Sequence, residues 1–118
     1  MSPTPSLSPL RGEIWMLNLD PIRGHEQSGT RPALILSVDV FNAGPADLAI
    51  VIPITSRSKG VRSHVEVHPP EGGLNVVSFI KCEDIRSVTK ERLNRRLGEV
   101  STPIMREVED KLRILLGL

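Results

Sequence analysis

The sequence predicts a mainly β fold (α+β class), a small curled antiparallel β-barrel followed by one C-terminal helix. Three observations predict this class: short apolar runs dominate the first two thirds of the chain, turn-forming residues separate them, and a helical apolar pattern occupies the end. The 118 residues are enough for one domain with a single modest core. We expect a mobile tail over residues 1–10 and one domain over residues 11–118.

Five segments have the composition of β-strands. Glu13–Leu19 alternates imperfectly between apolar and polar residues, and Ala33–Val38 and Leu48–Ile54 are continuous apolar runs. Val65–Val67 and Val76–Ile80 complete the set. Continuous apolar runs are typical of strands that are buried on both faces or packed in a closed barrel.

Glycine and proline mark the connections between these segments. The sequences NAGP at 42–45 and PPEGG at 69–73 are both strong turn signals. Short strands in close succession, joined in this way, indicate a small antiparallel barrel. The segment Ser87–Arg96 is ambiguous and is compatible with one short helix.

The last part of the chain predicts an amphipathic helix. Thr102 is placed to cap it, Pro103 suits its first position, and Gly117 ends it. Apolar residues recur every three or four positions at Ile104, Val108, Leu112 and Leu115. The other positions are largely charged, which is typical of a solvated outer face.

Charge and cysteine content narrow the classes of function. Fifteen basic and fourteen acidic residues give a net charge of +1, so a nucleic-acid site must come from local clustering of cations. Cys82 is the only cysteine, which leaves a reduced residue of the core or of an interface. His64 and His68 are too far apart on a strand to chelate, so we expect no metal and no cofactor. The first ten residues lack the pattern of a signal peptide or a membrane anchor, and the cytoplasm is the expected location.

The loop before the second apolar run carries the most informative polar residues. Gly24 and Gly29 let the sequence GHEQSGTRP at 24–32 turn, and Pro32 sets the backbone where the strand begins. This loop presents Glu26, Gln27 and Arg31 to a ligand. The planar guanidinium of Arg31 suits a phosphate or a carboxylate, although an ordinary surface ion pair would give the same pattern.

Several separated motifs resemble one family in the same order. They are RGEIW at 11–15, DP at 20–21, GHEQSGTRP at 24–32, IPITSRSKG at 52–60 and DIRS at 84–87. Together with the final helix they resemble the MazF/PemK (Kid) family of bacterial toxin endoribonucleases of type II toxin-antitoxin systems. The resemblance runs from about Arg11 to the C-terminus, and the ordered set is far more specific than any one motif.

The resemblance implies a fold, a reaction and partners. The fold is an SH3-like barrel of the MazF/CcdB type, assembled as a homodimer. The reaction is metal-independent, sequence-specific cleavage of single-stranded mRNA, in which the 2'-hydroxyl attacks the phosphate and leaves a 2',3'-cyclic phosphate and a 5'-hydroxyl. The expected protein partner is a cognate MazE-like antitoxin whose acidic tail occupies the RNA groove.

The resemblance also assigns Arg31 and Thr55 as the catalytic pair. Arg31 would stabilise charge and Thr55 would donate a hydrogen bond to a phosphate oxygen. An arginine with a pKa above about 12 is a poor general base, so Glu26 and His25 are both candidates for the proton transfer. The alternative role for Glu26 is to orient Arg31.

Phosphate contacts are expected from a second loop around Gly60. The predicted RNA-binding residues of the two loops and nearby strands are Arg23, His25, Gln27, Ser56, Arg57, Lys59, Arg62, His64 and Arg86. The alternative is a solvated run of charges. Trp15 and Phe79 lie in apolar segments and are expected in the core, so bases would be recognised by hydrogen bonds to single-stranded RNA.

Two other functions compete with the nuclease. A non-catalytic SH3-like module would bind nucleic acid or protein with the same arginines. A gyrase poison of the CcdB type shares the barrel but depends on a C-terminal Trp-Gly-Ile, whereas this chain ends Leu-Leu-Gly-Leu. Incubation with long single-stranded RNA separates the nuclease from the binding module.

Overall fold

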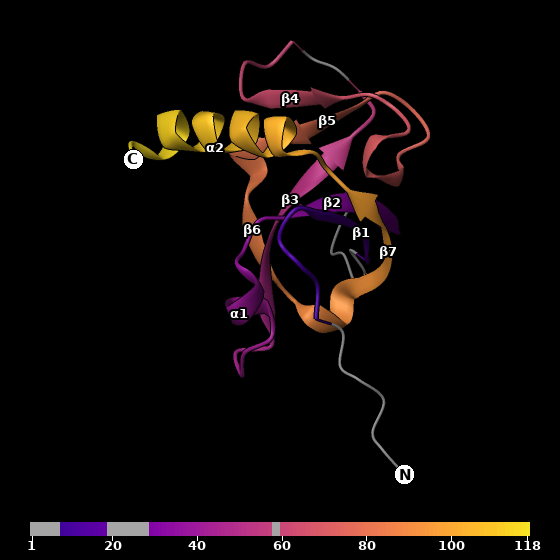
Figure 1. Ribbon diagram of the computed structural model, residues 1–118, viewed down its shortest axis with the longest axis vertical. Helices are drawn as coiled ribbons and strands as arrows, with labels where there is room; N and C mark the ends of the chain where they lie inside the picture. Colours follow the sequence, from indigo (N-terminus) through magenta and orange to yellow (C-terminus); the bar gives the residue numbers. More distant parts are fainter. Residues whose placement is uncertain (1–7, 19–28, 58–59) are drawn as a thin grey trace.

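One curled antiparallel sheet and one long helix make up the fold (Figure 1). The computed structural model describes residues 8–18, 29–57 and 60–118. The strands are β1 (Glu13–Asn18), β2 (Thr30–Ile35), β3 (Leu48–Thr55), β4 (His64–Val67), β5 (Ser78–Lys81), β6 (Arg86–Thr89) and β7 (Leu93–Glu99). The helices are the short α1 (Asp39–Asn42) and the C-terminal α2 (Thr102–Leu116).

The strand order confirms the predicted class. The sheet runs β4-β5-β3-β2-β1-β7, and β6 pairs with β3, all antiparallel. The long strand β3 pairs with β2, β5 and β6, and so it joins the upper and lower parts of the sheet in Figure 1. The described end strands β4 and β7 are not paired with each other, so the sheet is barrel-like without being closed.

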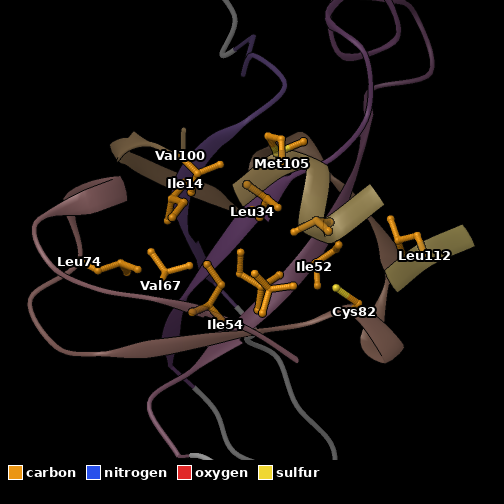
Figure 2. Close-up of a cluster of buried hydrophobic side chains, with 13 residues drawn as sticks. Ile14, Leu34, Ile52, Ile54, Val67, Leu74, Cys82, Val100, Met105 and Leu112 are labelled. Carbon is orange, nitrogen blue, oxygen red and sulfur yellow. The ribbon is translucent and has the colours of Figure 1, made fainter. Parts of the chain in front are cut away.

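Successive side chains of the central strands point to opposite faces of the sheet, and this creates two cores. Leu34 of β2 faces one core while its neighbours Ala33 and Ile35 face the other, and Ile52 and Val51 of β3 divide in the same way. The first core is closed by α2 (Figure 2). The continuous apolar runs are therefore strands buried on both faces, as predicted.

Cys82 lies in the first core and carries a free, fully buried thiol, as the sequence analysis expected. Burial, with a contribution from the neighbouring Glu83 carboxylate, raises the pKa of this thiol to about 11. The thiol is therefore neutral at physiological pH and acts as a small apolar side chain.

The ambiguous segment forms strands. Ser87–Arg96 contributes β6 and most of β7, joined by a 3₁₀ turn at Lys90–Arg92, so the short helix is reduced to that turn. Val88 pairs with Ala49 of β3 and is buried, which fixes the register of β6. Tertiary pairing with β3 and β1 thus overrides a weak local preference.

Helix α2 begins one residue earlier than predicted. Ser101 is the N-cap, and its hydroxyl accepts a hydrogen bond from the Ile104 N–H at 3.4 Å, so the prediction of Thr102 as cap was wrong. Gly117 ends the helix in the left-handed conformation with φ of 70°, as expected. Met105 faces the core, whereas Leu115 is 45% exposed. Within the described residues, no helix is long and apolar enough to cross a membrane.

The PPEGG turn packs closely against β7. Gly72 and Gly73 have φ of 69° and 74°, a region that side chains rarely adopt. A Cβ atom added to Gly98 of β7 would lie 2.6 Å from the carbonyl carbon of Gly72. The backbone of the turn therefore lies so close to β7 that no side chain fits between them. This close packing holds the turn, and the chain that follows it, against the sheet.

A buried carboxylate ties the N-terminal segment to the sheet. Glu13 accepts hydrogen bonds from the Leu10 N–H at 2.7 Å, the Trp15 indole at 3.0 Å and the Arg96 guanidinium at 2.6 Å. Burial alone would raise the pKa of Glu13, but these three donors outweigh it and lower the pKa below its ordinary value. Nearby, the buried Asn42 donates to the Pro9 carbonyl at 2.9 Å.

Glu13→Gln is expected to lower stability most at neutral pH. Because the folded-state pKa is below the ordinary value of 4.5, ionised Glu13 stabilises the fold above that pH, and this contribution is lost as the pH falls through the folded pKa. We expect a loss of about 1 to 3 kcal/mol at pH 7 that shrinks toward pH 3. Chemical denaturation of both proteins at the two pH values measures it, and an equal difference at both would contradict the ionised role.

Candidate active site

Arg31 and Thr55 come from the neighbouring strands β2 and β3 and line one hollow. Arg31 lies opposite Leu17 of β1, and the β2–β3 pairing ends at Ala33 and Pro53. The same register, continued by two residues, would set Arg31 across from Thr55, on the same face of the sheet. Both residues are half-buried, so their positions are fixed by the sheet while they stay accessible.

These two residues line a hollow of about 490 Å³, which we name the first hollow. Its walls come from β2, from the end of β3 and the segment after it, from the start of β4, and from β5 and the turn after it. The lining residues are Arg31, Thr55, Ser56, Arg57, Val61, His64, Lys81 and Glu83. Three permanent or near-permanent cations therefore meet in one hollow despite the near-neutral chain, which suits an anionic ligand.

The hydroxyl of Thr55 is oriented by its own loop. Its Oγ1 accepts a hydrogen bond from the Arg57 backbone N–H at 3.2 Å. A hydroxyl has one proton to donate, and this contact uses only an acceptor site. Thr55 can therefore donate to an oxygen of a ligand held by Arg31.

Glu83 is the one carboxylate among the described residues of this lining. It accepts a hydrogen bond from the Ser63 hydroxyl at 2.6 Å and pairs with His64 Nε2 at 2.9 Å. Burial would raise the pKa of Glu83, but the bonds from Ser63, from the backbone and from His64 lower it below its ordinary value. Glu83 is therefore an ionised, firmly held acceptor in a hollow otherwise rich in cations.

His64 is held inside the wall. Its side chain is only 6% exposed, and no described group hydrogen-bonds its buried Nδ1. Its ring lies against Phe79, with centroids 6.5 Å apart. Phe79 pairs with Thr55 and is half-buried, so the expectation that it belongs to the core was wrong.

The structure gathers five of the predicted site residues around the first hollow: Arg31, Thr55, Ser56, Arg57 and His64. Arg62 and Arg86 are exposed and lie outside its described lining. The remaining predicted residues, Arg23, His25, Glu26, Gln27 and Lys59, lie outside the residues that the structure describes.

Sequence reasoning missed Lys81 and Glu83. Lys81 alternates with the buried Ile80 at the end of β5, so it shares the face of Phe79. That alternation is the signal that could have found Lys81. Glu83 lies in the 3₁₀ turn Cys82–Asp84 after the strand, where no such pattern applies. The proximity of both residues to Arg31 depends on strand pairing, which the sequence alone does not give.

Comparison with known proteins agrees with the fold. The family described as "PemK-like, MazF-like toxin of type II toxin-antitoxin system" matches residues 10–116. The chain is 38% identical to "Endoribonuclease PemK" of Escherichia coli over 108 residues, 90% of this chain and 80% of that protein. MazF from Deinococcus radiodurans superposes with a TM-score of 0.80 at 35% identity, covering 95% of this chain and 99% of that chain.

A chain of the MazE-MazF structure (Form-III) from Deinococcus radiodurans gives a TM-score of 0.79 at 33% identity, with 95% of this chain and 99% of that chain covered. The family match spans nearly the whole chain and includes every strand and α2. As its ordered motifs predicted, the chain belongs to the PemK-like, MazF-like toxin family of type II toxin-antitoxin systems.

Proposed function

We propose that the protein is a metal-independent, sequence-specific endoribonuclease toxin that cleaves single-stranded mRNA. The observation that carries the proposal is that Arg31 of β2 and Thr55 of the neighbouring β3 line one basic hollow. The relative named endoribonuclease PemK supports the class of reaction. The 2'-hydroxyl gives up its proton to a base and its oxygen attacks the phosphorus. The bond to the 5'-oxygen breaks and that oxygen takes up a proton, so the products are a 2',3'-cyclic phosphate and a 5'-hydroxyl.

Arg31 and Thr55 act on the charge that builds up at phosphorus. The guanidinium of Arg31 offers five donors on a permanent cation and pairs with the equatorial phosphate oxygens. The Thr55 hydroxyl donates to one of the same oxygens. Because the Arg57 N–H holds the Thr55 hydroxyl before RNA arrives, little reorganisation of that hydroxyl is needed in the transition state.

A general base takes the proton of the 2'-hydroxyl. Glu26 and His25 are the candidates in the sequence motif, and Glu83 is the carboxylate that lines the first hollow. Cleavage by three variants, Glu26→Gln, His25→Gln and Glu83→Gln, across a range of pH separates the three candidates. The residue that serves as base is the one whose replacement removes the acidic limb of the pH profile, and an unchanged limb rules that residue out.

RNA is held through its backbone phosphates by the cations of the hollow and of the second loop. Arg57 and Lys81 line the first hollow. Arg62 is exposed and directly follows Val61, which also lines that hollow. Each neutral replacement should flatten the salt dependence of RNA binding by about 0.7 in log-log slope. Titrations at several salt concentrations check this, and unchanged slopes would leave these cations as a solvated loop.

Incubation of the purified protein with a long single-stranded RNA in EDTA tests the proposal directly. Fragments with 5'-hydroxyl and cyclic phosphate ends support it. Binding without cleavage would instead favour a non-catalytic nucleic-acid module. Cleavage that appears only when a divalent cation is restored would overturn the metal-independent mechanism.

Thr55→Ala is expected to lower kcat by about ten- to a hundredfold and to change RNA affinity by less than about threefold. One neutral hydrogen bond adds little to binding, but it counts in the transition state, where the phosphate oxygen carries more charge. Single-turnover cleavage gives the rate, and binding to an oligonucleotide with a 2'-deoxy cut site gives the affinity. Thr55→Ser is the control that keeps the hydroxyl, and equal inactivity of both variants would indicate a packing role.

The protein assembles as a homodimer and is neutralised by a cognate MazE-like antitoxin. Ile114, Leu116 and Leu118 at the end of α2 are 79%, 53% and 83% exposed, which is unusual for an isolated surface and favours a protein contact there. Light scattering after gel filtration measures the mass, and a monomeric wild type would contradict the dimer. The antitoxin's acidic tail would occupy the first hollow, so RNA should compete with it for binding.

A further inference from the structure

We propose that a second hollow beside Arg31 and Thr55 holds the nucleotide next to the cut, and that Asn75 reads the base of that nucleotide. The inference rests on the proposed nuclease function and assigns part of its sequence preference to a residue outside the two predicted loops. The second hollow has a volume of about 530 Å³ and shares Arg31, Thr55 and Ser56 with the first. An RNA strand whose scissile phosphate lies at Arg31 therefore has space on both sides of it.

The walls of the second hollow have the chemistry of a nucleotide site. Asn75 is exposed, and its side-chain amide can donate and accept hydrogen bonds at a base edge. Val76 is 55% exposed and, with the half-buried Leu97, gives an apolar surface for the face of a base. Arg95 is exposed at the same hollow and can hold a flanking phosphate.

The segment that carries Asn75 is held in place before any ligand binds. The turn before it packs on β7 through Gly72 and Gly98, and Leu74 is buried in the first core. After it, the Ser78 hydroxyl donates to the Val76 carbonyl at 2.9 Å. A fixed backbone lets one amide favour some bases over others, because a wrong base edge cannot be met by a shift of the chain.

Arg96 has a different role in this wall. Its Nε donates to the buried Glu13 at 2.6 Å, which ties the guanidinium to the sheet. Arg95, its neighbour on β7, is exposed and lines the same hollow. Arg95 is therefore the cation expected to contribute to RNA affinity, while Asn75 is expected to set the base preference.

Asn75→Ala should relax base preference at one position next to the cut by roughly 5- to 100-fold, the range of a base-specific contact, and leave the other positions unchanged. Asn94→Ala is the matched control, since Asn94 is exposed on β7 and lies outside both hollows. Sequencing of cleavage ends from digested total RNA measures the preference. A cut motif identical in wild type, Asn75→Ala and Asn94→Ala would overturn the inference while leaving the nuclease intact.

A binding experiment tests the base site independently of the proposed nuclease activity. Wild type and variants are titrated with oligonucleotides that carry a 2'-deoxy cut site and differ in one base beside it. If only Asn75→Ala loses discrimination between the bases, the base site is supported, even if the protein cuts no RNA. Absence of cleavage would defeat only the nuclease proposal. Equal discrimination between the oligonucleotides in all three proteins overturns the base site.

Discussion

Arg31→Ala is expected to lower kcat/KM for RNA cleavage by at least about a hundredfold, a loss of about 2.7 kcal/mol of transition-state stabilisation. Arg31 is a permanent cation that lines both hollows together with Thr55. The fold should survive, because the half-buried side chain lies outside both cores. Single-turnover cleavage measures the loss, and circular dichroism checks the fold.

Arg106→Ala is the matched control for charge, since Arg106 is an exposed arginine on α2 that lines neither hollow. It should keep wild-type activity. Arg31→Lys should be nearly as inactive as the alanine variant, because an ammonium cannot pair with two phosphate oxygens in the same plane. More than about a tenth of the activity left in Arg31→Ala would mean a loss below about 1.4 kcal/mol, too small for the central charge stabiliser.

The sequence could predict the fold because its strongest signals are local. The continuous apolar runs around Leu34 and Ile52 predicted strands buried on both faces, and the two cores are the result. The Pro103 and Gly117 signals bounded α2 to within a residue. Local patterns failed where a strand is half exposed: Ser87–Arg96 alternates weakly, and only pairing with β1 and β3 makes it a strand.

The candidate site could be predicted only in part, for a related reason. Arg31, Thr55 and Arg57 lie in recognisable motifs, so resemblance identified them before their geometry was known. Lys81 and Glu83 follow a segment without a distinctive motif. Lys81 reaches the hollow through the β4–β5 register, and Glu83 through the 3₁₀ turn that follows β5. Asn75 reaches the second hollow through packing of a turn on β7. The spacing of residues in the sequence does not show which of these distant segments meet in the fold.

Gly98→Ala is expected to destabilise the protein by about 2 to 3 kcal/mol and to lower the melting temperature by roughly 10 °C or more. The added methyl group would lie 2.6 Å from the Gly72 carbonyl carbon and 2.8 Å from the Gly73 nitrogen, both backbone atoms that cannot move without displacing the turn. Thermal unfolding by calorimetry measures the change.

Gly117→Ala is the control for this variant. A Cβ atom at Gly117 meets nothing within 4 Å, so only the left-handed φ of 70° opposes it, at about 1 to 2 kcal/mol. Since the turn at 71–73 leads into the wall of the second hollow, Gly98→Ala should also weaken base preference at temperatures where the protein is still folded, and Gly117→Ala should not. Equal melting temperatures for wild type and Gly98→Ala would mean that the turn yields without cost, and the rigid placement of Asn75 would lose its support.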